Sequence, residues 1–270
     1  MRYSIDVHKE RTDRVQTDDI DFDDFRRQPL DEDTLRCIRY MHDVEHHTIC
    51  YLRDVLVTPA HQDVEITTFL SFWAFEEYWH GEALGRVLEA HGESSEARIV
   101  AHRDGFDWHD RILPIATFVA SKITSHVPAV HLSWGAINEW TAQAAYGRLA
   151  AKAEHPTLSR LLARIMKQEG RHIDFYASQA HARLEGSPAA QRMTRVALRR
   201  LWAPVGSGVM PRPEVHHLVT YLFGDEAGRE AVDRIDRRID QLPGLEGMRL
   251  VAQANDRWFD ADQRYSVSVG

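Results

Sequence analysis

The segment Glu77-Tyr-Trp-His80 has the pattern Glu-x-x-His, and Glu169-Gly-Arg-His172 repeats it later in the chain. Residues three apart lie on one face of an α-helix, so each segment would present a carboxylate and an imidazole to the same point. One such pair is a weak signal, because glutamate and histidine are common on protein surfaces. Two copies, each within the apolar stripe of a long predicted helix, are much more specific.

A single glutamate lies in the middle of the helix before each pair: Glu45 precedes Glu77, and Glu139 precedes Glu169. Glu45 lies about 11 residues before the end of its helix, and Glu77 about 14 after the start of the next, which is roughly 16 Å up and 21 Å down. Likewise, Glu139 lies about 15 residues before the end of its helix, and Glu169 lies about 12 residues after the start of the next. Two antiparallel hairpins would therefore bring all four carboxylates to one level.

Buried carboxylates and imidazoles are costly unless they are paired or bind a metal. Four glutamates and two histidines carry about four negative charges, which suits two divalent cations. This is the ligand set of ferritin-like di-iron and di-manganese bundles. Mixed oxygen and imidazole ligation favours two Fe²⁺ ions, or Mn in place of Fe. The predicted metal ligands are Glu45, Glu77, His80, Glu139, Glu169 and His172.

The rest of the pattern predicts an all-α chain: a ferritin-like four-helix bundle with a long crossover and additional C-terminal helices. The four bundle helices are expected over residues 31–56, 63–91, 128–154 and 157–184. Further helices are expected over 108–126, 188–202, 213–223 and 225–242. We expect residues 1–28 to form a polar arm, 29–250 the di-iron helical domain, and 251–270 a C-terminal tail.

Composition excludes several classes of function. The net charge of −8 argues against nucleic acid as a partner, since phosphate binding needs a basic surface. The sequence contains no run of about 18 uncharged apolar residues, so we expect no membrane-spanning helix. Cys37 and Cys50 share one predicted helix and cannot pair, which favours a reducing, cytoplasmic location.

The other histidines and one basic stripe have weaker interpretations. His46 and His47 lie off the apolar stripe and are expected to be partly exposed, whereas His42, one turn from Glu45, could support a ligand. Surface positions are expected for His61, His216 and His217. A basic stripe on one predicted helix is either a solvated face or a docking patch for an acidic carrier. It comprises Arg192, Arg195, Arg199 and Arg200.

At these residues the chain resembles the soluble acyl-acyl carrier protein desaturases, of actinobacterial type. Trp73-Ala-Phe-Glu-Glu77-Tyr-Trp-His80-Gly81 is similar to that family's second ligand helix, and Glu169-Gly-Arg-His172 to its E-x-R-H motif. Glu45 and Ile137-Asn-Glu139 fit the first and third ligand helices. The resemblance covers about residues 30–185 and extends to Leu242-Pro-Gly-Leu245.

The resemblance implies a homodimer in which Glu77 and Glu169 bridge two irons, with the other four ligands terminal. Reduced iron would activate O₂ to desaturate a fatty acyl chain on acyl carrier protein, with electrons from a ferredoxin-type donor. No catalytic residue beyond the metal ligands is implied. Two positions differ from the family, because Ala142 stands where a threonine is usual and Gln168 where an acid is common.

Competing functions remain open at this level. A related di-iron oxygenase could hydroxylate or N-oxygenate another substrate. Ferritin-type iron oxidation and storage would not need the crossover and C-terminal helices. A ribonucleotide reductase small subunit would need a tyrosine at the place of Leu84, and a metal-free scaffold would not keep all six ligands. A narrow apolar tunnel would favour desaturation, and a compact polar pocket would favour the oxygenase. The absence of a tunnel would favour iron storage. The small residues expected to line such a tunnel are Gly135, Ala136 and Ala142.

Overall fold

The computed structural model describes residues 3–56, 58–104 and 125–266. Its elements are α1 (Ile5–Arg11), α2 (Asp24–Arg27), α3 (Glu32–Leu56), the 3₁₀ helix η1 (Pro59–Gln62), α4 (Val64–Ala90), α5 (Ser95–Asp104), α7 (Val127–Ala153), α8 (Pro156–Leu184), α9 (Pro188–Leu201), α10 (Arg212–Phe223), α11 (Glu226–Ile239) and α12 (Leu250–Ser266). No strand occurs in these three ranges, so the all-α prediction is confirmed. Most of the helix predicted over 108–126 lies outside the described residues.

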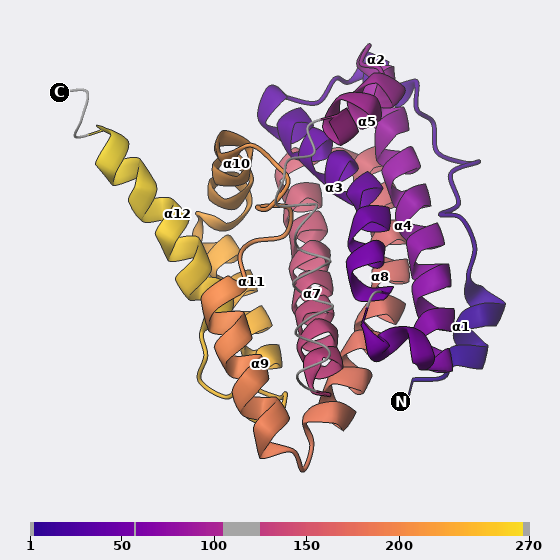
Figure 1. Cartoon of the computed structure of the whole chain (residues 1–270). Helices are drawn as coiled ribbons and strands as arrows, with labels where there is room; N and C mark the ends of the chain where they lie inside the picture. The colour runs from indigo at the N-terminus through magenta and orange to yellow at the C-terminus, as the bar shows by residue number, and fades with distance from the viewer. Residues whose placement is uncertain (1–2, 57, 105–124, 267–270) are drawn as a thin grey trace.

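Four long helices form the bundle. α3 packs against α4 and α7 against α8, and the two hairpins lie side by side (Figure 1). Local chemistry fixes where these helices begin: the Asp63 carboxylate accepts the backbone N–H groups of Glu65 and Ile66, at 3.0 and 3.1 Å. Pro128 and Pro156 occupy the first turns of α7 and α8, where proline is tolerated. Because the boundaries match those predicted, the candidate ligand residues keep their expected depths.

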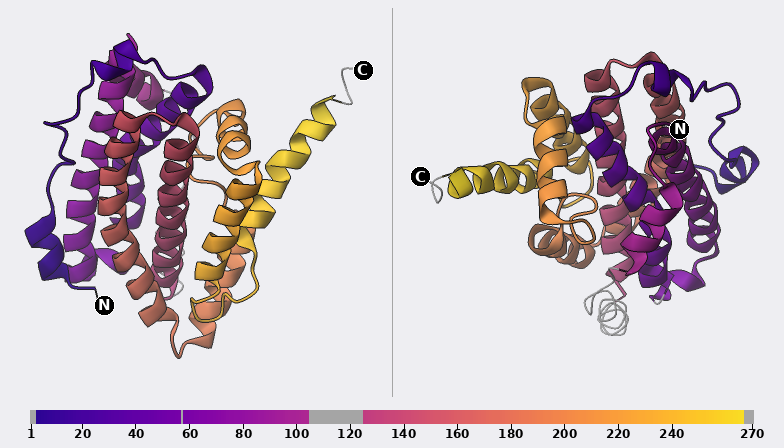
Figure 2. Two further views of the ribbon diagram at one scale, coloured as in Figure 1. Left: turned by 180° about the vertical axis from the view of Figure 1, so that it is seen from behind. Right: turned by 90° about the horizontal axis from the view of Figure 1, so that it is seen from above.

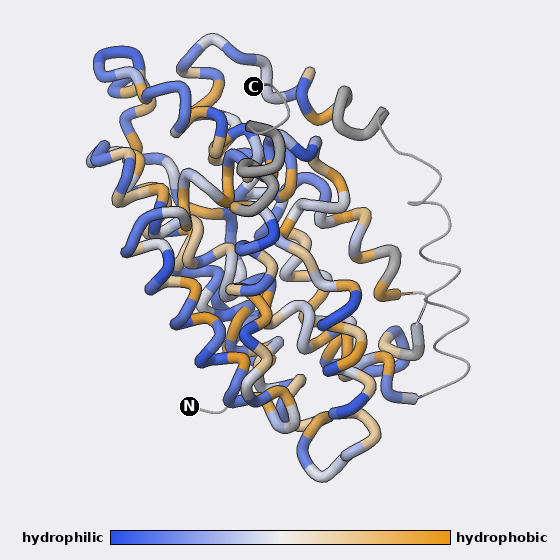
Figure 3. Tube along the Cα trace, turned by 90° about the vertical axis from the view of Figure 1, so that its left-hand side faces the viewer, coloured by the Kyte–Doolittle hydropathy of each residue, from blue (hydrophilic) through white to orange (hydrophobic). Residues whose placement is uncertain are grey.

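The core runs along the bundle axis. Hydrophobic and hydrophilic stretches alternate along the helical turns in view, as amphipathic helices require (Figure 3). All four bundle helices contribute fully buried apolar side chains. Examples are Ile38, Leu84, Leu88, Ile137, Leu149, Leu162 and Ile165.

The N-terminal residues form more than a polar arm. Besides α1 and α2, they contain an extended stretch that follows the outer faces of α4 and α8 (Figures 1 and 2). Arg164 on α8 donates to both carboxylate oxygens of Asp19, each at 2.6 Å, and Arg86 on α4 donates to the Thr17 hydroxyl at 2.8 Å. His8 on α1 is only 1% exposed. This arm therefore covers one side of the bundle.

The C-terminal helices lie on the other side of the bundle: α9, α10 and α11 pack against α7, and α12 packs against α10 and α11 (Figure 2). The region expected to be a tail contains α12, which starts where the Asp236 carboxylate accepts the backbone N–H groups of Val251 and Ala252, both at 3.0 Å. Helix α5 was also not predicted. Among the described helices, none is both long and apolar enough to cross a membrane.

Close packing of α3 against α4 depends on Gly81. A Cβ atom at this position would lie 2.6 Å from Nε2 of His46, well inside normal contact distance. We expect Gly81→Ala to lower the free energy of unfolding of the metal-free chain by about 1–3 kcal/mol, because the contact is overpacked. Gly147→Ala on α7 is the matched control, since its Cβ would meet Met166 Sδ at an ordinary 3.7 Å. Urea unfolding compares the two, and equal losses would contradict the packing argument.

Candidate metal centre

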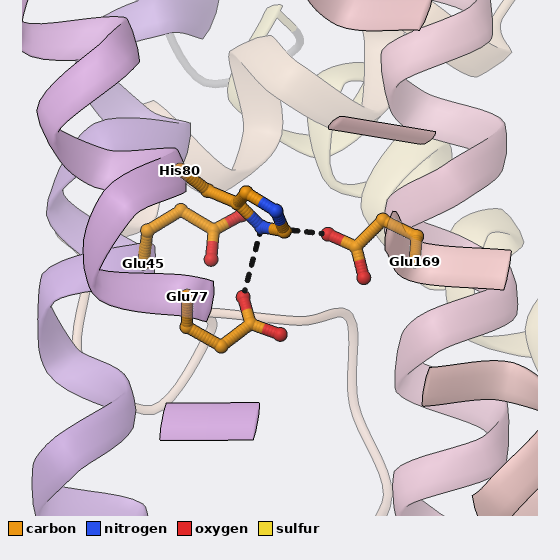
Figure 4. A group of neighbouring side chains, drawn as sticks. All are labelled: Glu45, Glu77, His80 and Glu169. Atoms are coloured by element: carbon orange, nitrogen blue, oxygen red, sulfur yellow. Dashed lines mark ion pairs between the residues drawn. The ribbon is translucent and has the colours of Figure 1, made fainter. Parts of the chain in front are cut away.

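The six predicted ligands meet inside the bundle, and each is at most 8% exposed. Their oxygen and nitrogen atoms form two groups, and within each group the atoms lie within 4.8 Å of one another. The first group is Glu45, Glu77, His80 and Glu169, shown in Figure 4. The second group is Glu77, Glu139, Glu169 and His172. Glu77 and Glu169 belong to both groups, which is the position of bridging carboxylates.

The two histidines face these shared carboxylates. Nδ1 of His80 lies 3.5 Å from Glu77 and 3.3 Å from Glu169 (dashed in Figure 4). Nδ1 of His172 lies 3.0 Å from both Glu77 and Glu169, and 3.8 Å from Glu139. Each imidazole therefore points one nitrogen at the centre between the two Glu-x-x-His pairs.

Hydrogen bonds outside the cluster fix the orientation of both rings. Nε2 of His172 donates to Glu76 at 2.7 Å, and Nε2 of His80 donates to the side-chain oxygen of Gln168 at 2.8 Å. With Nε2 occupied, Nδ1 is the nitrogen that remains for a metal, as is usual for ligand histidines. Gln168 thus orients His80, a predicted ligand, through a neutral amide.

The lone glutamates also have outer partners, which sequence reasoning missed. The indole N–H of Trp73 donates to Glu139 at 2.9 Å, and the Tyr146 hydroxyl donates to Glu45. The available signal was general: a buried tryptophan or tyrosine usually finds a hydrogen-bond partner for its polar tip.

Burial and close charges shift the pKa values of the cluster's side chains. Burial raises the pKa of Glu45 and Glu139 well above their usual range, and the neighbouring charges of Glu77 and Glu169 add to the effect. Burial alone would lower the pKa of His80, but the adjacent carboxylates of Glu169 and Glu77, which face its Nδ1, outweigh burial and raise the pKa to about 10. The raised pKa values show that the cluster favours positive charge where the carboxylates and imidazoles converge. Divalent cations would be stabilised at the same place.

Unsatisfied atoms also fit a metal site. Nδ1 of His80 and Oε1 of Glu77 are buried and make no well-directed hydrogen bond, although each faces oppositely charged groups across the centre. Buried polar atoms are rarely left in this state without a ligand or ion. The carboxylate and histidine cluster is thus fit for a dinuclear metal site.

A cavity of about 530 Å³ lies directly against the carboxylates. Glu45, Glu77, Glu139 and Glu169 line it, together with a wall that is mainly apolar. Leu201, 68% exposed at the end of α9, also lines it, so the cavity reaches the surface there. The other wall residues include Trp73, Trp134, Gly135, Ala142, Ala203, Pro204, Val205 and Val209. His80 and His172 are not among the residues that line the cavity.

Other predicted residues lie in different places. Gly135 and Ala142 line the cavity, whereas Ala136 is fully buried and is not among its wall residues. His46 is only 5% exposed, so its predicted exposure is wrong: Gly81 leaves room for its ring on α4. His42 hydrogen-bonds to Asp43 and Ser95 and so braces α5 rather than a ligand.

The basic stripe on α9 is divided. Arg195 donates to the backbone carbonyls of Gly244 and Glu246, each at 3.0 Å, and so holds the C-terminal loop. Its three companions are exposed: Arg192, Arg199 and Arg200.

No family model matches this sequence, and no curated protein matches it. Among solved structures, the chain is similar to an R2-like ligand-binding oxidase, a tyrosine-to-phenylalanine mutant with an aerobically reconstituted Mn/Fe cofactor. The TM-score is 0.63 and the identity 17%, over 89% of this chain and 92% of that one. This likeness shows the fold, a ferritin-like helical bundle.

Proposed function

We propose that this chain is an O₂-dependent oxidoreductase with a dinuclear iron or manganese centre. The observation that carries the proposal is the pair of overlapping buried groups that share Glu77 and Glu169. The Mn/Fe cofactor of the structurally similar oxidase supports it. The ligands would be Glu45, Glu77, His80, Glu139, Glu169 and His172.

When bound, the metals would supply the reduction of O₂ and the oxidising power to cleave an unactivated C–H bond. The protein supplies position and environment. Glu76 and Gln168 hold both histidines with Nδ1 inward, while Trp73 and Tyr146 fix the lone glutamates. The carboxylates face the cavity, so substrate would approach from that side. The apolar wall would exclude water from the reacting carbon atoms.

For the substrate, we propose a fatty acyl chain carried on acyl carrier protein. The mainly apolar cavity runs from the surface at Leu201 to the carboxylates, which suits an alkyl chain. Arg199 and Arg200 are exposed in the last turn of α9, immediately before Leu201, and would meet an acidic carrier at the mouth. In the proposed reaction, –CH₂–CH₂– with O₂, two electrons and two protons gives –CH=CH– and two waters. The ferredoxin-type donor and the homodimer rest on the sequence resemblance.

A second candidate is a related oxygenase that hydroxylates or N-oxygenates a different substrate. Polar side chains line part of the cavity: His47, Thr48, Asn138 and Ser207. Thr141, next to Ala142, donates its hydroxyl to the Ile137 carbonyl at 2.8 Å and is not among the residues that line the cavity. The cavity itself counts against ferritin-type iron storage, which needs no substrate pocket.

The deciding experiment supplies the iron-loaded chain with reduced ferredoxin, O₂ and stearoyl-carrier protein, followed by mass spectrometry. Loss of two hydrogens supports desaturation, and gain of one oxygen supports the second candidate. Arg199→Glu with Arg200→Glu should raise KM for the carrier substrate at least about 10-fold. Arg160→Glu with Lys167→Glu, exposed on α8, is the control of equal charge. No product from a chain holding two irons would rule out the acyl substrate.

Metal loading should release protons. His80, with its pKa raised to about 10, is protonated at pH 7 and must lose that proton to bind a metal. The raised pKa of Glu45 and Glu139 adds to the release, so metal affinity should rise as the pH rises. Calorimetry of Mn²⁺ binding in two buffers of different ionisation enthalpy measures the number of protons. Binding enthalpies that do not depend on the buffer would contradict this account.

A further inference from the structure

The residue before the glutamate of each Glu-x-x-His pair braces the histidine of the opposite pair. Glu76, before Glu77 on α4, accepts the Nε2 hydrogen of His172 on α8. Gln168, before Glu169 on α8, accepts the Nε2 hydrogen of His80 on α4. The two halves therefore have matching geometry but differ in one group: a carboxylate stands behind one ligand histidine and an amide behind the other.

Both acceptors are fixed in place. The amide nitrogen of Gln168 donates to the backbone carbonyl of Asp13 in the N-terminal arm at 2.8 Å, so the amide oxygen must face His80. Glu76 is fully buried, and Arg171 donates to its Oε1 while Oε2 faces His172 at 2.7 Å. The arginine pairing keeps Glu76 ionised. His8 of the arm lies 3.7 Å from the same Oε2 and closes this side.

A carboxylate behind a ligand histidine has a definite effect. It accepts a charge-assisted hydrogen bond, which is about twice as strong as a neutral one. This pushes electron density toward Nδ1 and strengthens the metal bond. Arg171 offsets part of the charge, but it lies on the far oxygen, and Coulomb energy falls with distance.

We propose that Glu76 and Gln168 make the two metal positions unequal, so that the position at His172 fills first and favours the more highly charged ion. The inference rests on the proposed dinuclear centre and concerns how that centre is loaded. Neither residue is among those lining the 530 Å³ cavity, so both would act on the metals and not on the substrate. They are positioning residues.

The test is an anaerobic titration of the metal-free chain with Mn²⁺, followed by calorimetry. The unaltered chain should bind two ions in two steps, the first about 10–100-fold tighter, which is the usual weight of an outer-shell partner. Glu76→Gln should weaken the first step to the level of the second. Gln168→Glu should instead raise the affinity of the second binding step toward that of the first. This variant provides the test if Glu76→Gln does not fold.

The reversal variant, Glu76→Gln with Gln168→Glu, keeps the net charge and exchanges the two groups. Anomalous scattering from crystals with one Mn²⁺ per chain should place the ion at His172 in the unaltered chain and at His80 in the reversal variant. If the ion stays at His172 in the reversal variant, or if both binding steps of the unaltered chain have equal affinity, this inference is wrong. The proposed dinuclear centre would still stand. No Mn²⁺ binding in the unaltered chain would overturn the dinuclear centre as well.

Discussion

A Glu77→Ala chain is expected to fold but to bind fewer than one metal ion, where the unaltered chain binds two. Glu77 belongs to both ligand groups, so its loss removes one oxygen from each metal position and one of two bridges. Losing an outer-shell partner typically costs 10–100-fold in metal affinity, and a shared ligand should cost more than about 100-fold. Metal analysis after gel filtration gives the stoichiometry, and oxidation of substrate should fall to background.

The matched control is Glu230→Ala. Glu230 is an acidic residue on α11 whose side chain is 65% exposed, so the charge change is the same without any contact to the cluster. It should keep two metals and full activity. Circular dichroism of both variants separates loss of metal from loss of fold. A folded Glu77→Ala chain that retains two metals would contradict the assignment of this residue.

Ala142→Phe is expected to lower oxidation of a long acyl chain by about 100-fold while the metal content stays at two per chain, since misplacing a reacting group by 1 Å can cost this much. Ala142 lies one helical turn after Glu139 and lines the cavity. A phenyl ring there would fill space beside the carboxylates rather than disturb the packed core. Shorter chains should be less affected, so rates measured across a series of chain lengths test the geometry.

Ala163→Phe supplies the comparison, because Ala163 is exposed on α8 and the same ring would extend into solvent. Its rates should match those of the unaltered chain at every chain length. If Ala142→Phe also leaves all rates unchanged, substrate does not enter by this cavity. The proposed route from Leu201 to the carboxylates would then be wrong, while the metal centre would stand.

The fold and the meeting of the six candidate ligands could be predicted because both follow from helix geometry. A constant rise per residue converts spacing into depth, so Glu45 and Glu77 reach one level once the helix ends near Thr58 and Asp63 are known. Those ends carry clear local signals: Thr58 precedes a proline, and Asp63 caps α4 through its own side chain.

The surroundings of the ligands could not be predicted in the same way, because they depend on contacts between distant segments. Tyr146 meets Glu45, and Gln168 meets the Asp13 carbonyl, only after the bundle has assembled. His46 is buried because a glycine on the facing helix makes room for it. Arg195 carries the same charge as Arg199, yet only the packed C-terminal loop shows that its donors are already used.

The central claim is that two overlapping groups of side chains hold two metal ions. Anomalous difference maps from crystals of the fully loaded chain, measured at the Fe and Mn absorption edges, test it most directly. The account predicts two peaks inside the bundle, one bound by Nδ1 of His80 and the other by Nδ1 of His172, with Glu77 and Glu169 in contact with both. A single peak, or peaks that do not touch Glu77 and Glu169, would contradict it.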